Sequence, residues 1–567
     1  MKGLVGLAAL VVVITVTSRE AEAIASCDAS DSGALLEFAS AFNDYGKVLV
    51  SWQPGTDCCS WRWVNCSAIT GRVQGLEIVG PELKTGLPLI RKVDFGGPVG
   101  APLGRLMALQ YLRLTDVYFN TLAPWPIGQL WLTLTDLTLV RCNFSGGIPF
   151  TWGYLSNLRK LVLSSSFTGV LPGELCNLPN IWTFDVSDND LTGPFPSCLM
   201  NLKTVVVLRF DNNQLTGPLP PEVGMLSPTL STLSLANNKL TGPIPIALTK
   251  LTGLRELILE RNLLTGQIPS ELSLMKNLVL LDLSNNSFGG LIPPPLANLP
   301  KLSKLDLSNC SLVGPIPSNF GNLVSLTSFV ARYNNLTGSF PSSFGYIPAV
   351  NRLEVDVSYN KLTEDLPDTF YSVMTFKASH NSLTGVFPLS LAGAQYVDLS
   401  SNKLTGLASG DIPNNVSPLA YLRLDQNNIS ASIPRWFGSL NALNYMQVNE
   451  NQIYGGLPPA LLALPSLTFV NFSNNQLSGQ LGSFPSRSLV VLDLHRNQLT
   501  GAIPDDYISN TPALKYLDLS YNLLTRTIPA NLMQSGLSFL NLAGNKLCSC
   551  GDIPSIPLLS GLHQWIP

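Results

Sequence analysis

The amino-acid sequence predicts one long solenoid. About 20 repeated units would stack into a parallel β-sheet on a concave face, with short 3-10 and turn segments on the convex face. Two observations predict this fold. An Asn recurs in the frame L-x-x-L-x-L-x-x-N-x-L, and the phrase L-T-G-x-I-P or a near variant follows it. The recurring residues are Asn189, Asn213, Asn238, Asn262, Asn286, Asn334, Asn360, Asn381, Asn402, Asn427, Asn451, Asn475, Asn497, Asn522 and Asn545.

The segment x-x-L-x-L-x-x of each unit alternates apolar and variable positions, as in Leu281-Asp282-Leu283. This period of two predicts a strand whose leucines are buried and whose other side chains face solvent. The Asn that follows is polar at a fixed point of an apolar frame, so it should be buried and bonded to the backbone of neighbouring turns. Cys142 and Cys310 stand at this ladder position, where we expect core thiols.

The L-T-G-x-I-P phrase predicts how each unit returns to the next strand. Its Gly permits a turn and its Pro prevents a regular helix from following. Between Pro81 and Val117 the frame is stretched, and Val117 stands where Asn is expected. These early units should be the least regular.

Composition narrows the function. Charged residues make up 13% of the chain, the formal net charge is −3, and no run of Lys or Arg is present. The sequence therefore lacks the electrostatic footprint expected of a protein that binds nucleic acid or an anionic membrane.

The ends of the chain predict export. Met1 and Lys2 precede an apolar run from Leu4 to Val16, and small residues follow near Ala23 and Ala25. This plan is typical of a signal peptide, and the run is short for a membrane anchor. We expect a signal peptide at 1–25, a cysteine-containing cap at 26–70, repeats at 71–547 and a short tail at 548–567, with no membrane span after cleavage.

The cysteines are consistent with an oxidising compartment. Four of them cluster before the first repeat, where a solenoid must cover the end of its core. Zinc binding is the competing interpretation, but no His lies nearby and the spacing is not that of paired C-x-x-C motifs. The four are Cys27, Cys58, Cys59 and Cys66.

These residues resemble the plant-specific class of extracellular leucine-rich repeats, whose hallmark is L-x-G-x-I-P after the Asn. The segment from Asp57 to Cys66, D-C-C-S-W-R-W-V-N-C, resembles the N-terminal cap of plant receptor-like kinases, receptor-like proteins and polygalacturonase-inhibiting proteins. The resemblance implies the disulfides Cys27–Cys58 and Cys59–Cys66.

A second pair of cysteines also lies in a stretch that resembles receptor-like proteins. Cys176 and Cys198 occupy similar phases of adjacent units, and they either form a bridge on the outer side or remain buried thiols.

The chain also departs from those families. The sequence shows no non-repeat island, acidic juxtamembrane segment, transmembrane helix or kinase domain. Polygalacturonase-inhibiting proteins have about half as many repeats. The pair Cys548 and Cys550 is spaced more closely than the usual end-cap pair, which leaves their pairing open.

Candidate ligand-binding residues lie on the predicted concave strands. Six residues before each ladder position, consecutive units carry Tyr396, Tyr421, Tyr445, Phe469, Val491, Tyr516 and Phe539. Aromatic side chains suit a recognition surface, although strand propensity alone also favours them. Four residues before the ladder position Asp is common, and the deviations are Arg209, Ile258, Val330, Lys377, Arg423, Gln447 and Asn471. We predict the binding patch at Tyr396, Tyr421, Arg423, Tyr445, Gln447 and Phe469.

Eight sequons predict N-glycosylation in an exported chain. They begin at Asn65, Asn143, Asn285, Asn309, Asn335, Asn415, Asn428 and Asn471. A glycan at Asn471 would obstruct the predicted concave patch.

Catalysis is not expected. The three histidines are His380, His495 and His563, and the motifs of nucleophilic hydrolases, phosphate-binding loops and zinc proteases are absent from the sequence. The concave Asp residues lie in open rows rather than as a shielded pair of the kind that glycosidases require. No metal or other cofactor is predicted.

The sequence therefore predicts a recognition protein, secreted to the extracellular space or cell wall. By its resemblance it would bind a peptide, protein or cell-wall glycan on its concave face and act with membrane receptor kinases in immunity or development. The alternatives are an inhibitor of cell-wall-degrading enzymes such as polygalacturonase, and a structural cell-wall component.

Overall fold

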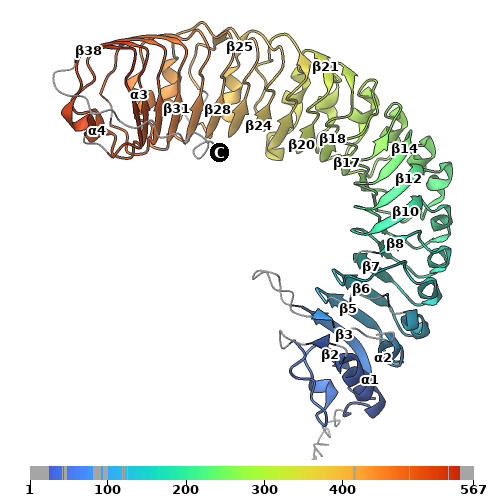
Figure 1. Ribbon diagram of the computed structural model, residues 1–567. Coiled ribbons are helices and arrows are strands. Elements are labelled where there is room, and N and C mark those ends of the chain that lie inside the picture. The colour runs from blue at the N-terminus through green and yellow to red at the C-terminus, as the bar shows by residue number, and fades with distance from the viewer. Residues whose placement is uncertain are drawn as a thin grey trace, which may run out of the picture.

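The computed structural model describes residues 25–548 apart from 41, 44–47, 81–90, 93–99, 118, 120–121, 124, 165–166, 413–416, 484 and 534–535. Within these residues the chain forms an open arc whose inner side is lined by strands and whose outer side carries short helices (Figure 1). The predicted solenoid is thus confirmed. Residues 1–24 of the expected signal peptide, the tail beyond Cys548 and part of the stretched segment after Pro81 lie outside the described residues.

The concave sheet follows chain order, because each turn of the solenoid places its strand beside the previous one in parallel. Its parallel strands are β3 (Val73–Val79), β5 (Tyr111–Thr115), β6 (Asp136–Val140), β7 (Lys160–Ser164), β9 (Thr183–Asp185), β11 (Val207–Arg209), β13 (Thr232–Ser234), β15 (Glu256–Ile258), β17 (Leu280–Asp282), β18 (Lys304–Asp306), β20 (Ser328–Val330), β22 (Leu353–Asp356), β24 (Val373–Lys377), β26 (Tyr396–Asp398), β28 (Tyr421–Arg423), β29 (Tyr445–Gln447), β31 (Phe469–Asn471), β33 (Val491–Asp493), β35 (Tyr516–Asp518) and β37 (Phe539–Asn541).

Short parallel sheets form where the L-T-G-x-I-P phrases of successive units meet. Their strands are β8 (Thr168–Gly169), β10 (Asp190–Pro194), β12 (Gln214–Pro218), β14 (Lys239–Gly242), β16 (Leu263–Leu264), β19 (Val313–Gly314), β21 (Asn335–Gly338), β23 (Lys361–Leu362), β25 (Val386–Phe387), β27 (Gly406–Leu407), β30 (Tyr454–Gly455), β32 (Gln476–Gln480), β34 (Gln498–Gly501), β36 (Leu523–Thr527) and β38 (Lys546–Cys548). Gly266 shows why this phrase needs glycine, because its φ is +80° and an added Cβ would lie 3.2 Å from Pro243.

The convex side carries one short helix in most units, each beginning after the Pro that ends the phrase. The 3-10 helices are η2 (Trp125–Leu130), η3 (Phe150–Tyr154), η4 (Gly173–Asn177), η5 (Ser197–Asn201), η6 (Pro221–Met225), η7 (Ile246–Lys250), η8 (Ser270–Leu274), η9 (Pro294–Asn298), η10 (Phe320–Asn322), η11 (Ser342–Tyr346), η12 (Ala349–Asn351), η13 (Leu389–Gly393) and η15 (Arg435–Ser439). Short α-helices replace them at α2 (Gly100–Gly104), α3 (Pro459–Leu462), α4 (Tyr507–Asn510) and α5 (Ala530–Met533).

The recurring Asn residues form a buried ladder through the core, as the sequence predicts. Asn262 is 5% exposed, and its Nδ2 donates to the carbonyl of Leu235 in the preceding unit at 2.9 Å. Its Oδ1 accepts from the N–H of Leu240 at 3.0 Å. The same pattern recurs in other units, so each Asn ties its own turn to the one before.

The two cysteines at the ladder position are buried, as expected of core thiols. Cys142 Sγ lies 3.4 Å from the carbonyl oxygen of Leu114, and Cys310 Sγ lies 3.2 Å from that of Leu283. Each thiol thus replaces the Asn amide as a donor to the preceding unit, and burial raises the pKa of Cys310 to about 12.

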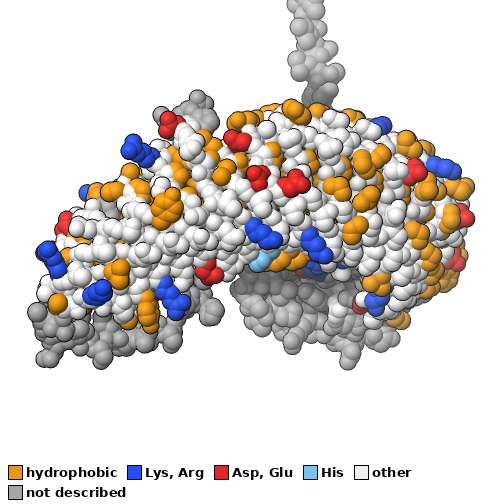
Figure 2. All heavy atoms as spheres, turned by 90° about the horizontal axis from the view of Figure 1, so that it is seen from above, with side chains coloured by type: hydrophobic (Ala, Val, Ile, Leu, Met, Phe, Trp, Pro, Cys, Tyr) orange, Lys and Arg blue, Asp and Glu red, His pale blue; other side chains and the backbone are white. Residues whose placement is uncertain are grey.

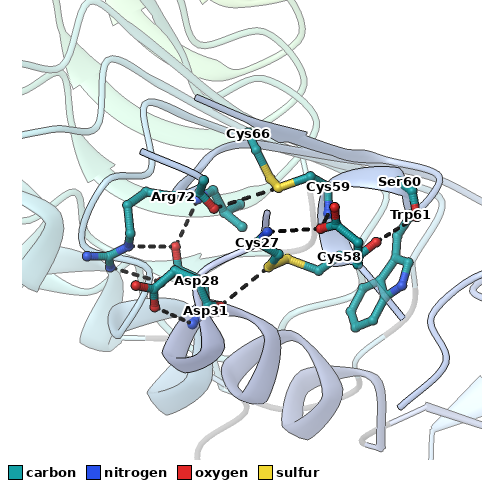
Figure 3. The surroundings of a disulfide bond; sticks show 12 residues. Cys27, Asp28, Asp31, Cys58, Cys59, Ser60, Trp61, Cys66 and Arg72 are labelled. Carbon is teal, nitrogen blue, oxygen red and sulfur yellow. Dashed lines mark hydrogen bonds and ion pairs between the residues drawn. A yellow bond between two sulfur atoms is a disulfide. The ribbon is translucent and has the colours of Figure 1, made fainter. Parts of the chain in front are cut away.

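The N-terminal cap covers the open end of the core with helix α1 (Ala29–Ser40), the 3-10 helix η1 (Cys58–Ser60) and strand β2 (Val64–Cys66), which pairs antiparallel with β3. A further antiparallel pair joins β1 (Phe42–Asn43) to β4 (Arg91–Lys92). The disulfides Cys27–Cys58 and Cys59–Cys66 fasten the cap, in the pairing that the family resemblance implies (Figure 3).

A buried ion pair joins the cap to the first concave strand (Figure 3). Both carboxylate oxygens of Asp31 accept from the guanidinium of Arg72 at 2.9 Å, and one also accepts from the N–H of Val73 at 2.8 Å. Because Asp31 is fully buried, these bonds satisfy a charge that would otherwise be costly.

Cys176 and Cys198 are joined by a disulfide between η4 and η5 on the convex side. Of the two possibilities that the sequence left open, the structure therefore contains the bridge. Among the described residues, no helix has both the length and the apolar content to cross a membrane.

Candidate functional site

The predicted aromatic residues lie side by side on adjacent concave strands. Tyr396, Tyr421, Tyr445 and Phe469 come from β26, β28, β29 and β31, and the strand register pairs each with the next. Their ring centroids are 4.2, 4.4 and 4.3 Å apart, and adjacent ring planes are within 6–8° of parallel. We call these four residues the aromatic column.

The column ends at Val491, which follows Phe469 in the strand register. Beyond this residue, Tyr516 and Phe539 form a separate stacked pair with centroids 4.3 Å apart. The seven positions read from the sequence therefore divide into a set of four rings and a set of two. Tyr516 thus has the same position in its repeat as the column residues but contacts none of them, so it can serve as a control in substitution experiments.

Stacking decides which part of each ring meets solvent. Because Tyr421 and Tyr445 each have a ring on both sides at about 4.4 Å or less, their faces are covered; Tyr421 stays half-buried, whereas Tyr445 is only 6% exposed. Ring edges carry the positive part of the aromatic quadrupole, so they favour acceptor groups over another stacked ring. The interior of the column is therefore better suited to carbonyl oxygens than to the face of a sugar.

Tyr396 and Tyr445 keep their phenolic protons. Burial raises the pKa of Tyr396 and of Tyr445 well above the ordinary value, and the neighbouring phenol of Tyr421 raises both further. The hydroxyl of Tyr445 donates to the side-chain oxygen of Gln447. The column thus offers neutral hydroxyl groups to a ligand.

Arg423 lies beside the column, where the sequence shows a departure from the usual Asp. Its Nε and Nη2 each donate to Asp425 at 3.0 Å, and its Nη1 lies 3.8 Å from Asp398. Burial alone would lower the pKa of Arg423, but the bonds to Asp425 and the charge of Asp398 raise it overall. Burial raises the pKa of the Asp425 carboxyl, and Arg423 opposes that change.

The other polar positions of the predicted patch are half-buried on the same strands. Gln447 follows Arg423 in the register, and Asn471 follows Gln447. The Oδ1 of Asn471 accepts from the N–H of Ser473 at 2.9 Å. On the other side, Lys377 Nζ lies 5.0 Å from the ring centroid of Tyr396, within the range of a cation–π contact. All six predicted patch residues are thus brought together.

The sequons differ in exposure. Asn65, Asn143, Asn309, Asn335 and Asn428 are exposed, whereas Asn285 and Asn471 are half-buried, and Asn415 lies outside the described residues. Asn471 lies on the concave sheet beside the column, where an attached glycan would occupy the same surface as a ligand.

Two groups of side chains in the described part of the chain have donor atoms close enough to hold a metal. The first is Cys27, Cys58 and Cys59, which are disulfide-bonded. The second is Asp493, His495 and Asp518.

Protein hydrogen bonds account for the second group. Nδ1 of His495 lies 2.7 Å from the carboxylate of Asp493. One unit later, the hydroxyl of Ser520 makes the equivalent contact with Asp518 at 2.6 Å. Asp518 also accepts from Asn541 at 3.2 Å. His495 thus occupies the place of the usual Ser beside the usual Asp, with a structural role.

A second set of stacked rings was missed by the sequence reasoning. Tyr333, Tyr359 and His380 each precede a ladder Asn, and their centroids are 4.4 and 4.2 Å apart with planes 17° and 18° from parallel. We call these three residues the left-handed aromatic row, because their φ values are +57°, +55° and +54°. Reading one residue before each ladder Asn would have found them.

Charged side chains are few on the outer face, and both signs are interspersed there (Figure 2).

Models of known families match several parts of the chain. The leucine rich repeat N-terminal domain matches residues 28–67, and the leucine rich repeat matches 229–251, 277–299, 301–323, 417–477 and 487–547. With the buried Asn ladder and the L-T-G-x-I-P sheets, these matches decide the family. The chain is a leucine-rich repeat protein of the plant extracellular type.

Curated relatives of this leucine-rich repeat chain include receptors and an inhibitor. Receptor-like protein 6 of Arabidopsis thaliana is 30% identical over 162 residues, which is 25% of this chain and 15% of that protein. The polygalacturonase inhibitor of Pyrus communis is 33% identical over 102 residues, which is 16% of this chain and 31% of that protein. The matched segments thus span less than a third of either relative.

Solved structures resemble the leucine-rich repeat chain over most of its length. The plant peptide hormone receptor RGFR1 in complex with RGF2 has a TM-score of 0.69 and 29% identity, covering 86% of this chain and 84% of that one. The Arabidopsis receptor kinase HAESA, in complex with the peptide hormone IDA and the co-receptor SERK1, has a TM-score of 0.62 and 28% identity. That match covers 92% of this chain and 94% of HAESA.

Proposed function

We propose that this protein is a secreted, non-catalytic receptor-like protein that binds an extended peptide, or a peptide segment of a protein, on its concave face. The observation that carries this proposal is the aromatic column of Tyr396, Tyr421, Tyr445 and Phe469 above the Arg423–Asp425 pair. The resemblance to ectodomains solved with peptide hormones supports it. Membrane receptor kinases are the proposed signalling partners, in immunity or development.

The ring geometry favours a peptide over a glycan. Sugars bind aromatic side chains through ring faces, and in the column the inner faces are covered by neighbouring rings. The surface that remains consists of ring edges, phenolic hydroxyls and the amide of Gln447, which match the carbonyl and N–H groups of an extended backbone. The net charge of Arg423 with Asp398 and Asp425 is −1, so no strong field selects an anionic polysaccharide.

The test uses a phage-displayed library of random twelve-residue peptides, panned against the intact protein. The variant Tyr421→Val/Tyr445→Val removes the column centre but keeps a residue that the same position carries at Val491. Tyr516→Val is the matched control, because Tyr516 lies outside the column. We expect selected peptides to lose about tenfold or more in affinity for the double variant and to keep their affinity for the control. Equal affinity for all three proteins would contradict the proposal.

Inhibition of a cell-wall-degrading enzyme is the second candidate. It is favoured by the 33% identity to the Pyrus communis polygalacturonase inhibitor over 102 residues. Incubating the purified protein with fungal polygalacturonase and measuring released reducing ends separates the two functions. Stoichiometric inhibition would support the inhibitor, and unchanged enzyme activity would exclude it for that enzyme.

A further inference from the structure

The left-handed aromatic row is not explained by folding. In unit after unit, the residue before the ladder position has a positive φ, which Asn and Asp adopt more readily than other residues with a Cβ. The residues in this position are Asp116, Arg141, Asp188, Asn212, Asn237, Arg261, Asn285, Asn309, Tyr333, Tyr359, His380, Ser401, Gln426, Glu450, Asn474, Arg496, Tyr521 and Gly544. Strand propensity can explain the aromatic column, but it cannot explain aromatic residues in a left-handed conformation.

The rings of this row are also poorly buried. Tyr333 is 50% exposed and Tyr359 is 42% exposed, and His380 is exposed as well. The positive φ itself belongs to the repeat, so the unusual feature of these three units is a row of adjacent, exposed aromatic side chains. Contiguous exposed apolar surface of this kind marks interaction sites.

The row of rings ends at the exposed residue His380. His380 stacks on Tyr359 on one side, and on the other side the next unit carries Ser401, whose small side chain donates to Gln426 at 2.7 Å. A planar group of a ligand could therefore stack on His380 and continue the series of rings at the spacing of one strand, about 4.8 Å.

The row and the column belong to units of the same concave sheet. The two aromatic sets lie at opposite ends of the concave strands, so a ligand contacting both would cross the sheet diagonally.

We propose that Tyr333, Tyr359 and His380 bind an aromatic side chain of the same extended peptide that lies along the aromatic column. This inference rests on the proposed function. A cationic side chain is disfavoured, because the guanidinium of Arg332 lies over Tyr333 with 5.9 Å to the centroid and Lys377 lies on the strand that leads to His380.

The pairing order β20–β22–β24–β26–β28–β29–β31 contains six steps between the two ends of this surface. Six steps of about 4.8 Å span about 29 Å, or about nine residues of extended peptide.

The test compares two variants that keep residues native to this row. Tyr333→Asn/Tyr359→Asn/His380→Ser removes the rings, and Tyr521→Asn is the matched control, because Tyr521 is 57% exposed at the same left-handed position in a distant unit. Ser is used at 380, since Asn there would create a sequon with Ser382. Peptides selected on the intact protein from the random twelve-residue library serve as probes.

We expect the triple variant to melt at the same temperature as the wild type or higher, while the affinity of the selected peptides falls about tenfold. Those peptides should contain an aromatic residue whose replacement by Ala weakens binding to the wild type but not to the triple variant. The control should bind as the wild type does.

Two results would overturn the inference alone, and a third would overturn the proposed function together with it. Peptides that need Tyr421 and Tyr445 but bind the triple variant normally would leave the proposed function intact and refute the role of the row. A clear fall in melting temperature for the triple variant would show that the rings support the fold. If no peptide were enriched on the wild type, the proposed function itself would fail, and this inference with it.

Discussion

Replacing Asn262 by Ala should destabilise the solenoid far more than the loss of one polar side chain would suggest. The substitution removes the donor to the Leu235 carbonyl at 2.9 Å and the acceptor for the Leu240 N–H at 3.0 Å. The Leu235 carbonyl keeps the bond from Asn238 Nδ2 at 3.2 Å, so losing the Asn262 donor there costs about 1 kcal/mol. The buried Leu240 N–H loses its side-chain acceptor, which costs about 1–3 kcal/mol, and the substitution should therefore cost about 3 kcal/mol in total. The bonds to Leu259 and Glu260 are longer, at 3.2 Å, and add less.

A natural substitution in the same chain refines this expectation. Cys310 stands at the ladder position and still donates to the carbonyl of Leu283 at 3.2 Å. The variant Asn262→Cys should therefore keep a weak donor and cost less than Asn262→Ala, by about 1 kcal/mol. If residue size decided the outcome, the smaller Ala would be the better tolerated of the two. Only the retained hydrogen bond predicts that Asn262→Cys is the more stable variant.

Urea unfolding followed by circular dichroism measures both variants, with Asn277→Ala as the control. Asn277 donates a single hydrogen bond, to the Thr252 carbonyl at 3.0 Å on the exposed side, so its loss should cost less than about 1 kcal/mol. Because repeats unfold in nearest-neighbour fashion, hydrogen exchange of the Leu240 amide reports the local loss directly. If Asn262→Ala were no more destabilising than Asn277→Ala, the hydrogen bonds of the Asn ladder would not stabilise the solenoid.

Three further outcomes are expected. Replacing Cys176 and Cys198 by Ser should lower the free energy of unfolding by about 3 kcal/mol, because their disulfide closes a loop with a sequence separation of 22. In that variant, reducing agent should cause no further loss of stability from this site. Asp31→Asn should cost about 2 kcal/mol in urea unfolding, since the fully buried side chain would lose an acceptor and turn an amide N–H₂ toward the guanidinium of the partly exposed Arg72, and a cost below about 0.5 kcal/mol would argue against that pair. The bond to Asp493 raises the pKa of His495. The contribution of this pair to the free energy of unfolding should therefore be complete below about pH 6.5 and lost as the pH rises through the higher folded pKa. If the difference in stability between the wild type and His495→Ser did not change with pH, this expectation would be wrong.

The repeat frame allowed the aromatic column to be predicted because side-chain direction in a strand follows from position alone. Once Asn427 and Asn451 fixed the frame, Tyr421 and Tyr445 had to lie on the concave side of adjacent strands. Their contact at 4.4 Å is then a consequence of parallel stacking in register. The frame placed Val491 among the seven positions, but only the ring contacts on either side of it show that the aromatic residues form two separate sets.

The left-handed aromatic row was missed for a different reason. The frame L-x-x-L-x-L-x-x-N treats the residue before Asn as one more variable position, and only the backbone shows that φ is positive there. Tyr359 and His380 become unusual once that conformation is known. The pairing of Asp31 with Arg72 was missed as well, since the two residues are far apart in the sequence and meet only where the cap packs on the first strand.

The sequence by itself determined the solenoid, the direction of each strand side chain and the burial of the Asn ladder. A repeated unit that cannot bury its own apolar face has to stack on its neighbours, and the period then assigns every residue to core, turn or surface. Tertiary structure decided which surface side chains lie in contact. The ring stacking and the sharing of Arg423 between Asp398 and Asp425 depend on side-chain reach between units, and a one-dimensional repeat does not specify that reach.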